Sequence, residues 1–195
     1  MKPIVIDDLL NILEYEKVRE TYRKELLVYK ADRRISLGPH ITITFENRRT
    51  MKFQIQEMMR AERMVHDEQI QEEIDIYNTL LPKNDSLSAT LFIEVADPAK
   101  IRPVLNQFIG LTLGESVYFQ IGDQKVYAEF EAGREEEDRI SSVHYIQFPF
   151  DMSSKEMFLS GDVSVQAGIN YAEYSFEILL ADEVLKSLRS DFGSE

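Results

Sequence analysis

The stretch from residue 51 to residue 66 carries apolar side chains on two opposite sides of a predicted helix. At about 100° per residue, one broad side collects five apolar residues. These are Met51, Ile55, Met58, Met59 and Val65. Phe53 and Met64 fall on the opposite side, next to Glu57 and Arg60. Such a helix is expected to lie enclosed between other elements, and its charges must then be paired or hydrated because an isolated buried charge is costly. This helix is therefore the first place to expect a site.

The rest of the N-terminal half is also mainly helical. Asp7 is placed to cap a short first helix, and an apolar stripe predicts a second helix over residues 16–33. Residues 40–45 alternate between apolar and polar, which is typical of a strand with one hydrated face. No glycine or proline interrupts residues 50–81, so this segment forms either one long helix or two. We favour two helices, with Asp67 as the N-cap of the second.

The C-terminal half has a different pattern, with short alternating runs separated by turn residues. Strands are predicted over residues 88–95, 117–121, 125–130, 141–148, 163–169 and 174–178. Helices are predicted from Pro98 to Gly110, from Ser153 to Leu159 and from Asp182 to Phe192. We therefore predict an α+β fold in one domain of residues 1–195, with a mainly helical part (1–85) packed on a β-rich, mostly antiparallel part (86–195).

Composition narrows the class of protein. The chain has 195 residues and no cysteine, which excludes disulfides, thiolate metal sites and a cysteine nucleophile. The net charge of −13 argues against nonspecific binding to nucleic acid. No apolar run approaches the roughly 18 residues of a membrane span, and no export signal is recognisable, so we expect a cytoplasmic protein without a membrane segment.

The charge is unevenly distributed along the chain. Residues 1–66 carry 13 basic against 10 acidic side chains, whereas residues 67–195 carry 9 against 25. This asymmetry is compatible with self-complementary pairing between copies, or with ordinary variation between surfaces. Glu131 and the acidic residues up to Asp138 form a charged loop, which is either a hydrated turn or a docking patch for a basic partner.

No catalytic motif is present: neither a glycine-rich phosphate loop nor a Gly-x-Ser-x-Gly elbow occurs, and enzymatic activity stays open. One hypothesis is a small-molecule pocket between the helix of residues 50–66 and the sheet. Its candidate residues are Glu57, Arg60, Glu62, Arg63 and His144. The competing interpretation is a structural ion-pair network on the helix, with His144 as a core residue of its strand.

Two further sites are considered for the same helix. Glu62 and His66 are four residues apart and are a weak candidate pair of metal ligands, but a metal would need at least one more ligand. We therefore predict no metal and no cofactor. Arginine suits carboxylates and phosphates, so an anionic ligand is the other alternative. The arginines concerned are Arg48, Arg49, Arg60 and Arg63.

Several segments also resemble a known family. They are Arg33-Arg34-Ile-Ser-Leu-Gly-Pro39, Phe45-Glu-Asn-Arg48, Gln54-Ile-Gln-Glu-Met58, Arg60-Ala-Glu-Arg63, Tyr77-Asn78, Leu87-Ser-Ala-Thr-Leu91 and Ser142-Val-His144. On these segments the chain resembles an uncharacterised bacterial domain-of-unknown-function family whose genes often lie beside those of rubrerythrin-like proteins and Fe–S oxidoreductases. The resemblance implies a cytoplasmic accessory to a redox or peroxide-stress module, and it supplies no catalytic residues.

Together these observations give two hypotheses of different classes. The first is a non-enzymatic interaction protein, most simply a homodimer, that docks to an Fe–S or rubrerythrin-like partner. The second is the small-molecule-binding protein or enzyme with the Glu/Arg/His pocket described above.

Overall fold

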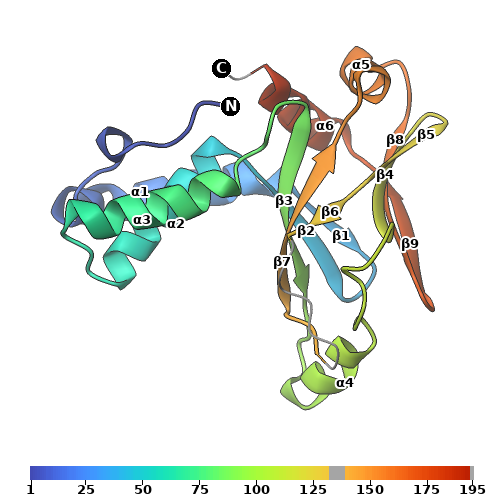
Figure 1. Ribbon diagram of the computed structural model, residues 1–195, viewed down its shortest axis with the longest axis horizontal. Helices are drawn as coiled ribbons and strands as arrows, with labels where there is room; N and C mark the ends of the chain where they lie inside the picture. The colour runs from blue at the N-terminus through green and yellow to red at the C-terminus, as the bar shows by residue number, and fades with distance from the viewer. Residues whose placement is uncertain (132–138, 194–195) are drawn as a thin grey trace.

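The computed structural model describes residues 1–131 and 139–193, which form a β-barrel with a helical arm on one side (Figure 1). The acidic segment 132–138 lies outside the described residues. The first sheet has the order β1-β2-β3-β7-β6, and the second has the order β5-β4-β8-β9. Every described ladder is antiparallel, which confirms the α+β class and the mostly antiparallel sheet.

The strands are β1 (Arg34–Leu37), β2 (Ile41–Glu46), β3 (Ser86–Ile93), β4 (Val117–Ile121), β5 (Gln124–Tyr127), β6 (Glu129–Phe130), β7 (Val143–Pro149), β8 (Val165–Tyr171) and β9 (Tyr174–Leu179). The α-helices are α1 (Ile12–Ala31), α2 (Arg48–Ala61), α3 (Asp67–Thr79), α4 (Ile101–Asn106), α5 (Met152–Ser160) and α6 (Asp182–Arg189). Short 3-10 turns lie at Ile6–Asp8, Pro98–Lys100 and Ser190–Phe192.

One segment joins the two sheets. Residues 124–127 pair with β4 in the second sheet, and Glu129 and Phe130 pair with β7 in the first. Ala128 lies between the two pairings and donates its backbone N–H to the carbonyl of Val117. Alternation predicts one strand over residues 125–130, but it does not reveal that this strand changes sheets.

The barrel closes on its other side through a side chain. Tyr174 of β9 donates its hydroxyl to the carbonyl of Leu37 at 2.6 Å and accepts the backbone N–H groups of His40 and Ile41 at 3.0 and 3.2 Å. Gly38 makes this approach possible, because a Cβ there would lie 2.6 Å from ring atoms of Phe176 and its φ is +76°. On this side the two sheets are therefore held together by hydrogen bonds between one tyrosine hydroxyl and three backbone groups.

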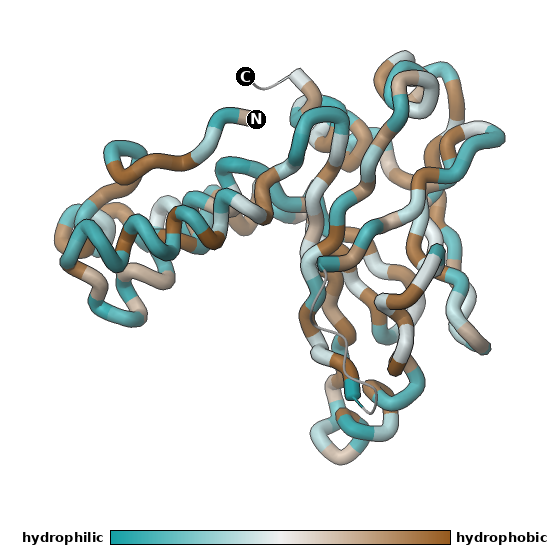
Figure 2. Tube along the Cα trace, viewed as in Figure 1, coloured by the Kyte–Doolittle hydropathy of each residue, from teal (hydrophilic) through white to brown (hydrophobic). Residues whose placement is uncertain are grey.

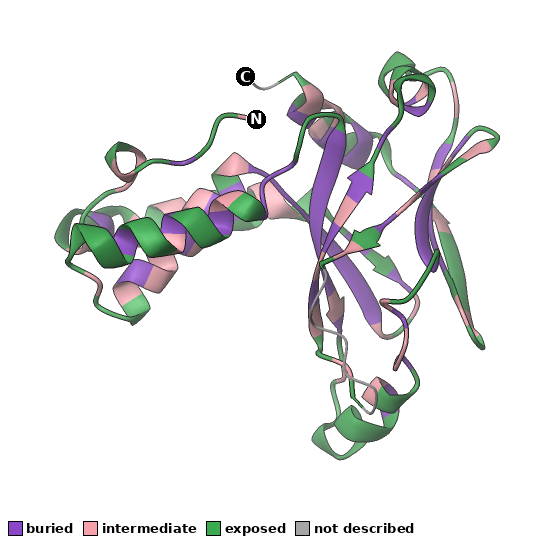
Figure 3. Ribbon diagram, in the orientation of Figure 1, coloured by how far each residue is buried: buried purple, intermediate pink, exposed green. Residues whose placement is uncertain are grey.

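The barrel interior is apolar and aromatic. Phe119 stacks against Phe45 at 5.6 Å between ring centroids and lies 4.6 Å from Phe148, which brings both sheets together. Figure 2 shows apolar residues running along the strands, and Figure 3 shows that β3 is almost wholly buried. This core fills the space between the sheets.

The arm consists of α1, α2 and α3, which lie side by side and project from the barrel (Figure 1). α2 contacts both α1 and α3, so it has neighbours on two sides. A second, smaller core lies between α2, α3 and the N-terminal segment, and its buried residues include Met51, Ile55, Ile70 and Ile74. The apolar residues of α2 thus pack within the arm, whereas Val65, which the sequence placed on the same side, follows the end of α2 and is exposed.

The sequence-based boundaries differ from the structure in several places. Residues 12–31 form one helix capped by Asn11, because Asp7 lies in a separate 3-10 turn. Residues 34–37 form a strand that we did not predict; it is too short for its alternation to stand out. Residues 50–81 form two helices, as favoured, but Asp67 is the first residue of α3 and not its cap. The division at residue 85 stays a sequence-based prediction, and β1 and β2 pair within the barrel sheet.

Candidate interaction surface on the helical arm

Glu57 joins α1 to α2. Its carboxylate accepts the Arg19 guanidinium at 2.7 Å and the Tyr15 hydroxyl at 2.7 Å. The Arg19 guanidinium holds the pKa of Glu57 below its usual value. Burial is the main reason that the pKa of Tyr15 is raised, and the hydrogen bond to Glu57 adds to it. Glu57 is thus engaged between two helices.

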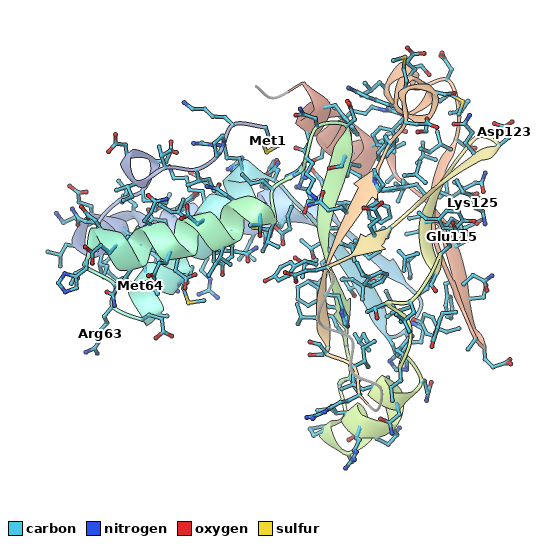
Figure 4. The ribbon with its side chains drawn as sticks, viewed as in Figure 1. Met1, Arg63, Met64, Glu115, Asp123 and Lys125 are labelled. Atoms are coloured by element: carbon cyan, nitrogen blue, oxygen red, sulfur yellow. The ribbon has the colours of Figure 1, made fainter. Side chains whose placement is uncertain are left out.

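The other predicted residues of α2 lie towards the outside. Arg60 forms an ion pair with Glu16 of α1 across the arm surface. Glu62 caps the end of α2, and Arg63 follows with a left-handed φ of 54°. Figure 4 shows Arg63 and Met64 at the tip of the arm, away from the barrel.

His144 lies in the barrel and not in the arm. It sits on β7 opposite Leu91 of β3, and only 3% of its surface is exposed. Its Nε2 hydrogen bonds with the carbonyl of Ser141 at 2.8 Å, and its ring meets the Phe130 ring edge-on. The structure therefore brings Glu57 and Arg60 into contacts between α1 and α2, leaves Glu62 and Arg63 at the tip, and places His144 on the barrel.

The pairing of Glu62 with His66 rests on one continuous helix, and the structure has a break between them. α2 ends at Ala61 and α3 begins at Asp67, so both residues are exposed in the connection. Within residues 1–131 and 139–193, no group of three or more His, Cys, Asp or Glu side chains is arranged to hold a metal ion.

Sequence reasoning did not reveal the buried network that attaches the arm to the barrel. Arg33 follows α1, is fully buried, and forms an ion pair with Asp191 near the C-terminus. Its Nε also donates to the carbonyl of Phe45 at 3.0 Å. Asn47 caps α2 and donates its side-chain amide to Tyr29 at 2.7 Å and to Asp191 at 2.8 Å. These residues lie up to 158 positions apart, so no local pattern could join them.

A second polar cluster lies where α2 meets the outer face of the first sheet. Glu46 is buried and accepts from Thr90 at 3.1 Å and from Gln54 of α2 at 3.2 Å, with Lys30 at 3.5 Å. Thr44, two residues earlier on the same face, has no hydrogen-bond partner for its hydroxyl among the described residues. A cavity of about 280 Å³ lies between the end of α3 and strands β6 and β7, beside Tyr145 and Gln147.

The N-terminal segment is fastened to the arm by two side-chain amides. Gln56 accepts from the backbone N–H of Leu10 at 2.7 Å and donates to its carbonyl at 2.9 Å. Asn78 likewise accepts from the backbone N–H of Ile4 at 2.8 Å and donates to its carbonyl at 3.0 Å. Between the fastened segment and the ends of α2 and α3 lies an open cavity of about 580 Å³, here called the tip groove.

A cavity of about 650 Å³ runs along the outside of β5 and β6. Lys125 and Glu115 point outward near it (Figure 4). Lys125 Nζ lies 3.8 Å from the centre of the Tyr118 ring, and Asp151 caps α5 by accepting the backbone N–H of Ser154. Two of its charged residues are therefore engaged in local structure.

The outer side of α1 carries exposed apolar residues. Tyr15 and Leu26 are buried on the side of α1 that faces the rest of the arm. Leu13, Leu27 and Val28 are 77%, 63% and 74% exposed on the other side. Because residues 13 and 27 are two heptads apart, they line up along one face of the helix. Exposed apolar side chains in such an arrangement are a feature of interaction surfaces.

An antiparallel β-barrel of two sheets, bridged by the Tyr174 side chain and carrying a fastened helical arm, defines a small α+β protein that exposes apolar surface on its arm. The chain belongs to the family described as Protein of unknown function (DUF3501), which matches residues 3–192. It is similar to a protein of known crystal structure described as a novel protein of unknown function from Burkholderia pseudomallei K96243. The two share 28% sequence identity with a TM-score of 0.90, over 97% of this chain and 99% of that chain. No curated protein matches the chain. None of the helices in the described part of the chain is long and apolar enough to cross a membrane.

Proposed function

We propose that this protein is a non-enzymatic interaction protein whose helical arm binds its partners. It acts as a cytoplasmic accessory to a redox or peroxide-stress module that contains a rubrerythrin-like or Fe–S protein. The observation that carries the proposal is the outer face of α1, where Leu13, Leu27 and Val28 are exposed on a helix that already buries Tyr15 and Leu26 on its other side. The redox partner is implied by the family resemblance.

The engagement of the candidate acid–base residues supports a non-enzymatic role. Glu57 holds Arg19 and Tyr15, and Arg60 holds Glu16, in contacts that fix α1 on α2. A general base must reach the proton it removes, and a carboxylate committed to an arginine and a tyrosine is poorly placed for that.

The proposal includes a homodimer formed through α1. Six exposed positions recur at intervals of four and three residues along its outer face. They are Leu13, Lys17, Glu20, Lys24, Leu27 and Ala31. In an antiparallel pair centred between Glu20 and Lys24, Glu20 of each copy faces Lys24 of the other, and Leu13 faces Ala31. Glu20 keeps 73% of its side chain exposed beside Arg19, so it is accessible to this pairing.

The experiment is affinity purification of the tagged full-length chain from its own host, followed by identification of bound proteins and their iron content. We expect one iron-containing partner at a constant ratio. A Leu13→Glu, Val65→Glu variant places one charge on each exposed arm surface and should lose the partner. The matched control is Leu113→Glu, Leu179→Glu on the barrel, where the two side chains are 69% and 67% exposed. Repeated recovery of the chain alone, or equal loss with both variants, would contradict the proposal.

A second candidate function is small-molecule binding between α2 and the sheet. It is favoured by the buried Glu46, which Gln54 of α2 reaches, and by the Thr44 hydroxyl beside it. Burial raises the pKa of Tyr77 in the same corner to about 12, so its hydroxyl is a hydrogen-bond donor at neutral pH. Native mass spectrometry of untagged protein tests this candidate. A bound mass that disappears in Thr44→Val would support it, and a bare mass would exclude it.

A further inference from the structure

The tip groove is a preformed apolar site at the end of the arm. Its floor is made by Met59 and Ile70, which are only 2% and 7% exposed and belong to the arm core. One wall is the N-terminal segment at Leu9 and Leu10. Gln56, itself 1% exposed, holds both backbone polar groups of Leu10, so this wall is fixed before anything binds. Preformed sites lose little conformational freedom on binding.

The groove opens to solvent along an apolar rim. Val65 is 69% exposed and Leu10 is 37% exposed, on opposite elements. Met64 lies beside Val65 at the tip and, with Met59, gives the site two flexible thioether side chains that adapt to different apolar shapes. An open apolar groove of this kind suits a protein segment lying along it more than an enclosed small molecule.

The charged residues that line the groove are all acidic. Asp7, Glu14 and Asp67 line it, and none of the three forms an ion pair with a residue in the described ranges. These carboxylates disfavour a fatty acid or another anionic amphiphile. They complement lysine or arginine side chains placed around an apolar segment.

We propose that the tip groove binds an apolar helical segment of a partner protein whose flanking side chains are lysine or arginine. This inference rests on the proposed function and names the chemistry of the partner. The groove borders the outer face of α1, because Ile12 and Glu14 line it and Leu13 lies between them in the sequence.

The test uses a fluorescein-labelled amphipathic peptide with leucine on one face and lysine on the other, and a matched peptide with glutamate in place of lysine. Fluorescence anisotropy should show that the lysine peptide binds about tenfold more tightly. A Leu10→Gln, Val65→Gln variant, which leaves the net charge unchanged, should weaken binding about tenfold. The control variant Leu113→Gln, Leu179→Gln should bind within about twofold of wild type.

Methyl NMR of the methionines locates the peptide independently of affinity. Met59 and Met64 line the groove, whereas Met152 is 80% exposed on α5 and serves as an internal control. We expect the first two methyl signals to shift on titration while that of Met152 stays in place. Shifts of Met152 alone, or equal weakening by the control variant, would overturn the inference.

The outcomes separate this inference from the proposed function. If the iron-containing partner is recovered and Leu10→Gln, Val65→Gln retains it, the groove is not its docking site, although the proposed function stands. If the peptide binds in the groove but no partner is recovered from the host, the site stands and the proposed function fails.

Discussion

At the scale of single residues, Glu57 has the clearest consequence for stability. It accepts hydrogen bonds from Arg19 and Tyr15, and its side chain is 28% exposed. A carboxylate held by an arginine has a lowered pKa, and here the Arg19 guanidinium is the main cause. The stabilisation from this pair is therefore complete above the ordinary glutamate pKa and is lost as the pH falls through the lowered value.

We expect Glu57→Gln to reduce the free energy of unfolding by about 1–2 kcal/mol at neutral pH, because the amide cannot replace the charge-assisted hydrogen bonds. The difference between variant and wild type should shrink as the pH falls from the ordinary glutamate pKa through the lowered pKa of Glu57, because Glu57 itself then becomes protonated. Urea titrations at several pH values measure both effects. Glu16→Gln, which affects the outer pair with Arg60, is the control and should change little. A difference that persists unchanged in acid would show that the ion pair does not cause it.

Two neighbouring arginines offer a second comparison. Arg33 is fully buried against Asp191, whereas Arg34 forms a half-exposed pair with Glu94. Arg33→Met should lower the free energy of unfolding by about 3–5 kcal/mol, because it leaves a buried carboxylate without its counter-charge. Arg34→Met should cost less than about 1 kcal/mol. Equal losses in chemical denaturation would mean that the buried network does not anchor the arm.

At the scale of elements, periodicity predicted most helices and strands. The enclosed helix was predictable because its apolar residues lie on two sides, with Met51 and Ile55 on one side and Phe53 on the other. The single helix of residues 12–31 was not, because Asp7 is as good a cap by composition as Asn11, and only the 3-10 turn at Ile6–Asp8 distinguishes them.

The candidate site was harder to predict than the elements. Glu57 and Arg60 lie on the same helix. The apolar residues on two sides of that helix predicted that its charged side chains would be paired with other elements. His144 was grouped with them because sequence gives no distance between a helix and a later strand. Arg33 and Asp191 form their pair only once β1, β2 and the C-terminal turn are assembled. Long-range pairs of this kind depend on topology, which local patterns do not contain.

The homodimer is also tested at this scale, through the outer face of α1. Glu20→Lys would place like charges opposite Lys24 of the second copy and should weaken the dimer about tenfold. Combining Glu20→Lys with Lys24→Glu exchanges the charges and should restore it. Sedimentation equilibrium measures the dissociation constants. A monomeric wild type, or a double variant no tighter than the single one, would contradict pairing through this face.

At the scale of the whole molecule, the arm and the barrel have separate cores. The larger core fills the barrel, and the smaller one lies between α2, α3 and the N-terminal segment. Of the 20 residues of α1, only Tyr15 and Leu26 are fully buried. Regions with few buried apolar contacts open locally at lower free energy than the core.

Native-state hydrogen exchange should therefore show α1 opening at a lower free energy than β2 and β3. Ile74→Ala, which removes a fully buried side chain from the arm core, should lower protection throughout the arm and leave the barrel strands nearly unchanged. Mass spectrometry of peptide fragments provides the measurement. If α1 and β3 exchange only through one common unfolding event, the arm and barrel behave as a single cooperative unit.

The closure of the barrel by Tyr174 has a consequence for solubility. β1 and β9 each pair with only one other strand, so each retains a row of backbone groups without a ladder on its outer side. Such sheet edges are templates for pairing with other chains. By binding the backbone of Leu37, His40 and Ile41 at the β1–β2 turn, the Tyr174 hydroxyl holds β9 against this end of β1. Loss of this hydroxyl, as in Tyr174→Phe, would leave the end of β1 more open to pairing with other chains.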